Sequence, residues 1–159
     1  MEAMDILPPT TTRVERNSHR EWNELNRLRT YAELARLKEA ERIEIDARLA
    51  ELDREWDIER VLNANAATII LVSVALAFAV NRRFLLLSTA VFTFFAQHAL
   101  HGWCPPVPIM RRYGIRTMRE IERERYALKA LRGDFERVTE RGFADPDERV
   151  RAALAAVDA

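Results

Sequence analysis

Two adjacent arginines, Arg82 and Arg83, are the only charged residues between Arg60 and Arg111. They divide this stretch into two charge-free runs of mostly apolar residues. A helix of about 20 such residues is long enough to cross the ~30 Å hydrocarbon core of a bilayer. The sequence therefore predicts a two-span antiparallel transmembrane hairpin that turns at the arginine pair.

Of the 50 charged residues (25 basic plus 25 acidic), 48 lie outside this pair, which predicts solvated helices on both sides of the hairpin. Ser18 and Glu21 have the spacing of a capping box and indicate the start of the first helix. We therefore expect an all-α fold with these segments: a disordered tail at 1–16, a charged amphipathic cytoplasmic helix at 17–57, the transmembrane hairpin at 58–110 (helices at about 58–80 and 84–102), and basic juxtamembrane and C-terminal helices at 111–159.

The distribution of basic residues predicts the orientation of the hairpin. Residues 41–60 carry four bases and residues 111–130 carry seven, against two at the tip. Because basic residues accumulate on the cytoplasmic side of membrane proteins, we expect both termini in the cytoplasm. Bases at the start of the last segment also favour contact with anionic lipid headgroups. The candidate headgroup residues are Arg111, Arg112, Arg116 and Arg119. No groove-reading motif is present, so we expect no nucleic-acid partner.

Two patterns bear on helix packing. Ile45, Leu49, Leu52 and Trp56 form a narrow apolar stripe that suits packing either on the chain's own C-terminal helices or on a partner helix. Small residues four apart in the first apolar run allow close helix approach, which favours a homodimer or a higher oligomer.

Polar residues inside the predicted hairpin fall at one level once the chain turns near residue 82. We expect them to form an intramembrane layer of interhelical hydrogen bonds near the cytoplasmic end. The members of this predicted layer are Asn63, Asn65, Gln97, His98 and His101.

The segment Gly102-Trp103-Cys104-Pro105 is the most specific motif. Glycine and proline end a helix here, and they leave the only cysteine at a polar boundary where a reactive thiol would be exposed. The alternative is a cysteine that only fills space. His98, His101 and Cys104 are suitable zinc or copper ligands, but no fourth ligand is evident, so we expect neither a metal site nor a cofactor.

The apolar pair with its two-arginine turn, this motif and the later Tyr113-Gly114-Ile115-Arg116-Thr117 resemble the YgaP-like transmembrane domain family. The resemblance covers about residues 57–118 and implies a short hairpin in the bacterial inner (plasma) membrane. Some members carry a rhodanese domain, whereas this chain has neither that domain nor a second cysteine. Sulfurtransferase activity therefore does not carry over.

Together these features predict a self-associating, non-enzymatic membrane or interaction module. One alternative is a sulfur or redox accessory in which Cys104 forms a persulfide or an intermolecular disulfide. Another is a soluble helical bundle that buries residues 66–80 within its own fold. No catalytic constellation is evident, and the sequence does not indicate a ligand.

Overall fold

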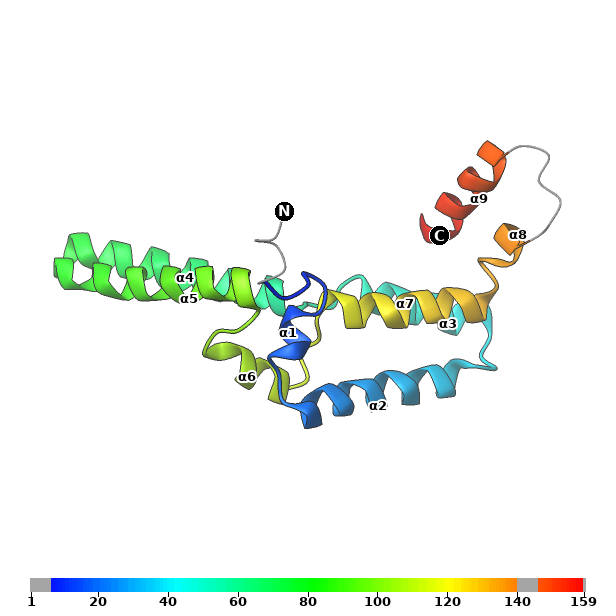
Figure 1. Cartoon of the computed structure of the whole chain (residues 1–159), viewed down its shortest axis with the longest axis horizontal. Helices are drawn as coiled ribbons and strands as arrows, with labels where there is room; N and C mark the ends of the chain where they lie inside the picture. Colours follow the sequence, from blue (N-terminus) through cyan, green and yellow to red (C-terminus); the bar gives the residue numbers. More distant parts are fainter. Residues whose placement is uncertain (1–6, 140–145, 159) are drawn as a thin grey trace. The chain divides into compact units, whose positions relative to one another are not determined.

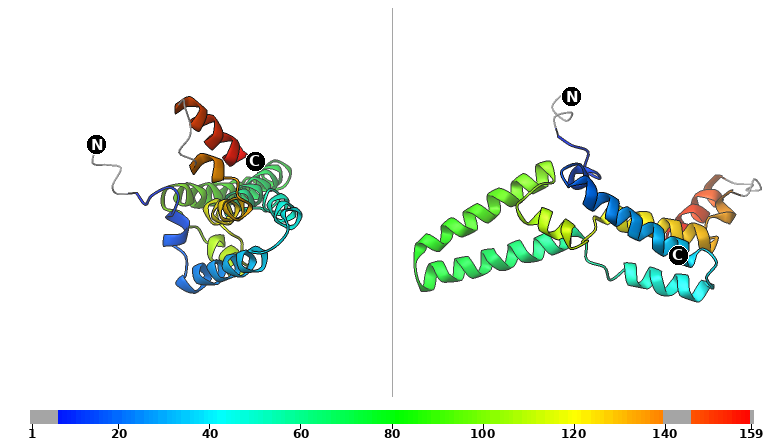
Figure 2. Two further views of the ribbon diagram at one scale, coloured as in Figure 1. Left: turned by 90° about the vertical axis from the view of Figure 1, so that its right-hand side faces the viewer. Right: turned by 90° about the horizontal axis from the view of Figure 1, so that it is seen from below.

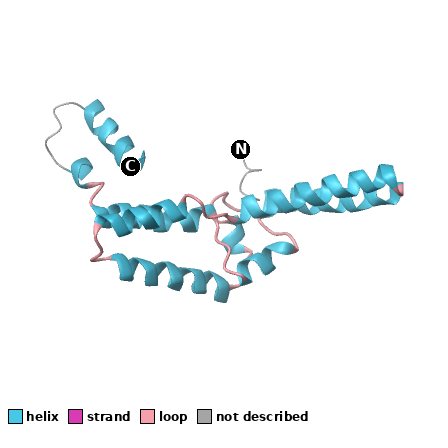
Figure 3. Cartoon of the chain, turned by 180° about the vertical axis from the view of Figure 1, so that it is seen from behind, coloured by secondary structure: helices cyan, strands magenta, loops and turns pink. Residues whose placement is uncertain are grey.

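The computed structural model describes residues 7–139 and 146–158, which are helical with no strand (Figures 1 and 3). Contacts divide the chain into two compact units, which are described separately. Residues 1–27 and 56–119 make up unit 1, and residues 28–55 and 120–159 make up unit 2. The predicted all-α class is confirmed for the described part of the chain.

Unit 1 is built around two long apolar helices that run antiparallel, as the views in Figures 1 and 2 agree. Asp57 caps the first helix by accepting a hydrogen bond from the Arg60 amide at 2.8 Å. Asn81 caps the turn by accepting a hydrogen bond from the Arg83 amide at 2.9 Å. The helices of this unit are α1 (Arg13–Arg16), the start of α2 (Arg20–Leu37), α4 (Ile58–Ala79), η2 (Arg82–Phe84), α5 (Leu85–His101) and α6 (Pro106–Arg112).

Both α4 and the η2–α5 segment are long and apolar enough to cross a membrane. Ser73 and Ser88, both buried, form a hydrogen bond of 2.5 Å between the two helices. Ala77 is also buried, one turn after Ser73. Small residues therefore let α4 and α5 approach closely within one chain.

The structure differs from the predicted tail at residues 1–16. Residues 1–6 lie outside the described part, but α1 is helical and Val14 is 5% exposed. Val14 packs in a core with Ile58, Leu62 and Cys104. The predicted capping box is also wrong, because the Ser18 hydroxyl donates to the Val14 carbonyl at 2.7 Å and α2 begins only at Arg20. Tertiary burial of Val14 orders a segment whose composition favours disorder.

Unit 2 contains the rest of α2 together with α3 (Arg42–Leu52), most of α7 (Met118–Arg132), α8 (Glu136–Thr139) and α9 (Pro146–Asp158). The predicted helix over 17–57 is thus two helices, with a break after Leu37 that no glycine or proline marks. Leu37 is 1% exposed and shares a core with Ile45, so the turn lets both helices bury their apolar residues.

The apolar stripe on α3 packs on α7, one of the helices in the C-terminal part of the chain. Ile45, Leu49 and Leu52 share a core with Ile121 and Leu128 of α7. The fourth stripe residue, Trp56, lies outside this core and is 47% exposed. Self-packing, one of the two alternatives that the pattern left open, is the one that the structure contains.

Ion pairs flank this core. Arg125 bonds Asp53 at 2.5 Å, and Arg132 bonds Asp46, so α3 and α7 run antiparallel. Hydrogen bonding to Asp134, opposed by burial and reinforced by Asp46, raises the pKa of Arg132 above its ordinary value. Charged side chains therefore surround a largely apolar seam, and the buried Glu124 is paired with Arg48 at 2.8 Å.

Candidate functional site

The candidate site lies where α5 ends. Gly102 adopts a left-handed conformation (φ +77°) that ends the helix with its amide bonded to the His98 carbonyl at 2.7 Å. A Cβ at this position would lie 2.5 Å from the carbonyl carbon of Arg13. Glycine is therefore required both by the backbone and by the close approach of α1. Asn17 secures this approach by donating to the His101 carbonyl at 2.6 Å.

A chain of polar contacts joins α1, α4 and α5 beside this glycine. The Nε2 atom of His98 lies 3.2 Å from both carboxylate oxygens of Glu59. Arg13 donates to Glu59 Oε1 at 2.7 Å. His98 is 1% exposed, and its other ring nitrogen, Nδ1, is buried without a hydrogen-bond partner among the described residues. The carboxylate therefore orients the ring through Nε2.

Cys104 lies next to this histidine. Its side chain is 1% exposed and interacts electrostatically with the His98 ring. The expected exposed thiol is thus wrong, because Pro105 and Pro106 start α6, which folds back on α4 and covers the sulfur. Cys104 nevertheless borders an apolar pocket of about 440 Å³ between α4, α5 and α6. The helix α6 was not predicted, since three prolines argued against one, but two of them occupy its first turn, where no amide is needed.

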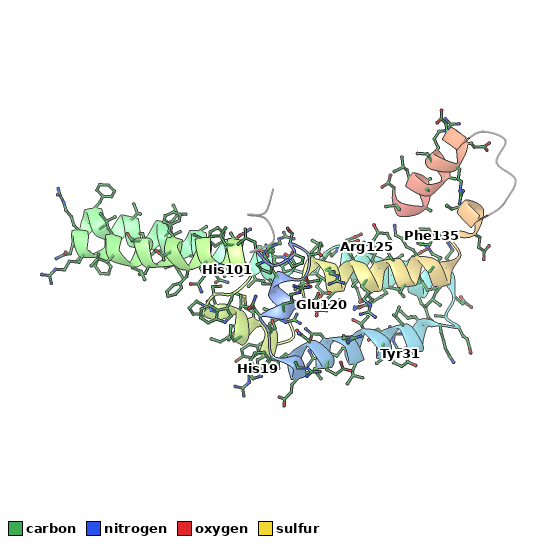
Figure 4. All side chains as sticks on the ribbon, viewed as in Figure 1. His19, Tyr31, His101, Glu120, Arg125 and Phe135 are labelled. Atoms are coloured by element: carbon green, nitrogen blue, oxygen red, sulfur yellow. The ribbon has the colours of Figure 1, made fainter. Side chains whose placement is uncertain are left out.

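The predicted polar layer does not form as expected. His98 is the only one of its five members that is buried. Asn63 is exposed, and Asn65 is exposed and donates to the Val61 carbonyl of its own helix at 2.8 Å. Gln97 is half-buried, whereas His101 is exposed at the end of α5 (Figure 4). The interhelical polar contacts are instead Glu59 with His98 and Ser73 with Ser88.

Two of the four predicted headgroup arginines are used inside the protein. Arg111 is 1% exposed and donates to the Asn23 carboxamide at 2.6 Å. Arg116 is 7% exposed, and its carbonyl accepts from the Ile58 amide at 2.9 Å. Arg112 is exposed, and Arg119 is half-exposed with Glu15 at 3.6 Å. Only the last two remain available to anionic lipid.

His98, His101 and Cys104, the three residues considered as metal ligands, do not come together in the structure. Within the described ranges there is no group of three histidine, cysteine or acidic side chains that could hold a metal ion. His101 is exposed while His98 and Cys104 are buried, so the chain turn at Gly102 separates His101 from the other two side chains. The fourth motif residue, Trp103, is half-buried.

Sequence reasoning missed Glu59 and Arg13 as members of the site. Glu59 lies just before Arg60, outside the charge-free run in which the predicted polar layer was placed. An antiparallel pairing about residue 82 puts Glu59 level with Pro105, beyond the end of α5, so it does not predict the contact with His98. Arg13 gave no signal, because it lay in the predicted disordered tail.

The described residues thus define an all-helical protein with two helices of membrane-spanning length, and with a buried cysteine and histidine next to a partly exposed carboxylate at one end. No protein-family description, no curated protein and no solved structure matches the chain. The resemblance to YgaP-like hairpins therefore has no support from these comparisons.

Proposed function

We propose that the chain is a two-span membrane protein whose α4–α5 hairpin crosses the bilayer. The observation that carries this proposal is the exposure of the apolar side chains on both helices. Only 22% of the apolar 18-residue stretch of α4, and 11% of the corresponding stretch of the η2–α5 segment, is buried inside the structure. Phe78 is 89% exposed, and Leu71 and Leu86 are each 71% exposed.

This exposure argues against the soluble helical bundle. A soluble protein rarely exposes a contiguous apolar patch of more than a few hundred Å². A helix in the core of such a protein would be mostly buried, whereas α4 and α5 bury chiefly the narrow seam between them that includes Ser73 and Ser88. Hydrocarbon is the environment that suits the remaining faces.

The proposed location is the bacterial inner membrane, with both termini in the cytoplasm. The eleven-to-two excess of bases at the end opposite the tip supports this orientation. Trp56 is 47% exposed with the Arg60 guanidinium 4.4 Å above its ring. An aromatic ring beside an arginine suits the cytoplasmic interface.

The proposed role is that of a non-enzymatic membrane or interaction module. Two pairs of small residues lie four apart on α4, and the pair Ser73 and Ala77 is already used within the hairpin. The pair Ala75 and Ala79 is exposed and would serve a homodimer or higher oligomer. Arg112 and Arg119 would contact anionic headgroups. The burial of Cys104 does not favour the alternative redox role through an intermolecular disulfide.

Membrane fractionation tests this proposal. After cells are lysed and membranes are washed with alkaline carbonate, the protein should sediment with the membranes and dissolve only in detergent. Recovery of folded protein in the carbonate supernatant would contradict the proposal. A peripheral membrane protein in the same lysate serves as the control that the wash has worked.

A further inference from the structure

The pocket beside Cys104 has the size and lining of a site for a hydrocarbon chain. Its volume of about 440 Å³ falls within the range of about 300–1,000 Å³ seen for small-molecule sites. The lining comes from α4, α5 and α6 and is apolar except for Asn65 and Cys104. A helix, about 10 Å or more in diameter, does not fit a hollow of this kind. A single acyl chain does.

A histidine outside the lining of this pocket lies next to the Cys104 thiol. Glu59 holds His98 Nε2 at 3.2 Å, and Nδ1 is buried with no hydrogen-bond partner among the described residues. Cys104 is the other side chain that interacts with the ring. A thiol, an imidazole and an orienting carboxylate in this order form the arrangement that activates a cysteine nucleophile.

We propose that Cys104 is a self-acylation site that takes the acyl group of a long-chain acyl thioester. This inference rests on the proposed membrane location, which brings the acyl chain to the pocket from the hydrocarbon. It goes beyond that location by assigning a covalent ligand to the cysteine.

The step balances without any redox partner. Cys104 Sγ attacks the carbonyl carbon of the thioester and forms a new C–S bond, while His98 Nδ1 takes the thiol proton. The donor's C–S bond then breaks, and the leaving thiolate receives that proton from His98. Glu59 is a positioning residue that accepts a hydrogen bond from Nε2–H. The product is a thioester whose chain occupies the pocket.

Two thioesters that differ only in chain length test the proposal on the full-length protein in phosphatidylethanolamine/phosphatidylglycerol vesicles. Palmitoyl-coenzyme A should acylate Cys104 at least ~10-fold faster than acetyl-coenzyme A, because each buried methylene favours binding. Intact mass and release by neutral hydroxylamine measure the product. Cys104→Ser should remove it.

A matched thiol separates this preference from simple enrichment of palmitoyl-coenzyme A at the vesicle surface. The control is His101→Cys in the Cys104→Ser background, which puts an exposed thiol three residues away in the sequence. The palmitoyl-to-acetyl ratio should be at least ~10-fold higher for Cys104 than for this control. Equal ratios would overturn the proposal.

The role of the base has its own test. His98→Asn should slow acylation by ~100-fold, the usual contribution of a general base, whereas His101→Asn should leave the rate unchanged. Glu59→Gln should lower the rate constant without changing the palmitoyl-coenzyme A concentration that gives half-saturation. An unchanged rate in His98→Asn contradicts the proposal. If this variant fails to fold, the chain-length comparison still decides.

Failure of the membrane location is recorded separately. The carbonate-resistant fraction of the protein on the same vesicles reports whether it is integrated. An integrated protein that shows no chain-length preference would contradict the acylation proposal alone. A protein that the carbonate wash removes from the vesicles would contradict both the acylation proposal and the proposed membrane location.

Discussion

The α4–α5 pair and the α3–α7 pair are both antiparallel, yet they distribute their side chains in opposite ways. Between α3 and α7 the seam is mostly apolar, with Leu52 and Leu128 almost fully buried, although the buried Glu124 pairs there with Arg48 at 2.8 Å. Between α4 and α5 the buried contacts include Ser73 with Ser88, and large apolar residues face outward. The two pairs therefore place large apolar side chains on opposite sides: in the seam between α3 and α7, and on the outer faces of α4 and α5.

This inversion supports the proposal that the two pairs pack in different solvents. In water, burial of apolar area is the main favourable term, so α3 and α7 associate through leucine and isoleucine. In hydrocarbon that term is absent, and close packing of small residues together with interhelical hydrogen bonds holds helices together. Four substitution pairs, taken from the largest expected effect to the smallest, test this difference.

Leu128→Ala should destabilise unit 2 by about 2–5 kcal/mol, because it opens a cavity in the α3–α7 seam. Leu86→Ala, on the exposed face of α5, should change stability by less than about 0.5 kcal/mol. Pulse proteolysis of the full chain in detergent, across a urea series, measures both. Similar losses in the two variants would remove the distinction between seam and outer face.

Leu71→Arg and Ile43→Arg compare exposed apolar positions of nearly equal accessibility, 71% and 72%. An arginine at the centre of a membrane helix costs about 2.5–3.5 kcal/mol of insertion free energy, so Leu71→Arg should reduce the carbonate-resistant fraction strongly. Ile43→Arg should leave that fraction unchanged, since α3 faces water. Unimpaired insertion of Leu71→Arg would mean that this face of α4 does not meet lipid.

Gly102→Ala should cost about 1–3 kcal/mol, because it combines a positive φ with a contact of 2.5 Å to the Arg13 backbone. Gly133→Ala, also at positive φ, is the matched control. Its Cβ would meet only the flexible Glu136 carboxylate at 3.1 Å, so the cost should be about 1 kcal/mol. Only Gly102→Ala should make α1 cleavable by trypsin after Arg13 or Arg16. Protection of both sites in that variant would show that α1 tolerates the extra atom.

Ser73→Ala and Ser88→Ala should each lower hairpin stability modestly. A double-mutant cycle on thermal unfolding in detergent should give a coupling of about 0.6 kcal/mol, the average for hydrogen bonds between membrane helices. A coupling near zero would indicate that the packing of small residues alone holds the pair.

Sequence reasoning found the features that depend on local composition. The charge gap on either side of Arg82 and Arg83 predicted the two apolar helices and their turn. The break after Leu37, the short helix α1 and the helix α6 could not be predicted in this way. Each depends on burial against residues distant in sequence.

The candidate site likewise combines a motif that is visible in the sequence with contacts that depend on distant residues. The motif at Gly102 and Cys104 was visible in the sequence, and its glycine ends α5 as the pattern predicts. The exposure of Cys104, however, depends on α6 folding back over it. The link from His98 through Glu59 to Arg13 joins three segments that only the folded chain brings together.

Cysteine labelling from one side of the membrane tests the central claim most directly. In the Cys104→Ser background, Asn81→Cys places a thiol at the exposed hairpin tip, and Glu39→Cys places one in the exposed turn between α2 and α3. A membrane-impermeant maleimide applied to intact spheroplasts should label Asn81→Cys and leave Glu39→Cys unlabelled until the membrane is opened. Equal labelling of both cysteines in sealed spheroplasts, or labelling of Glu39→Cys alone, would contradict a hairpin that crosses the membrane with cytoplasmic termini.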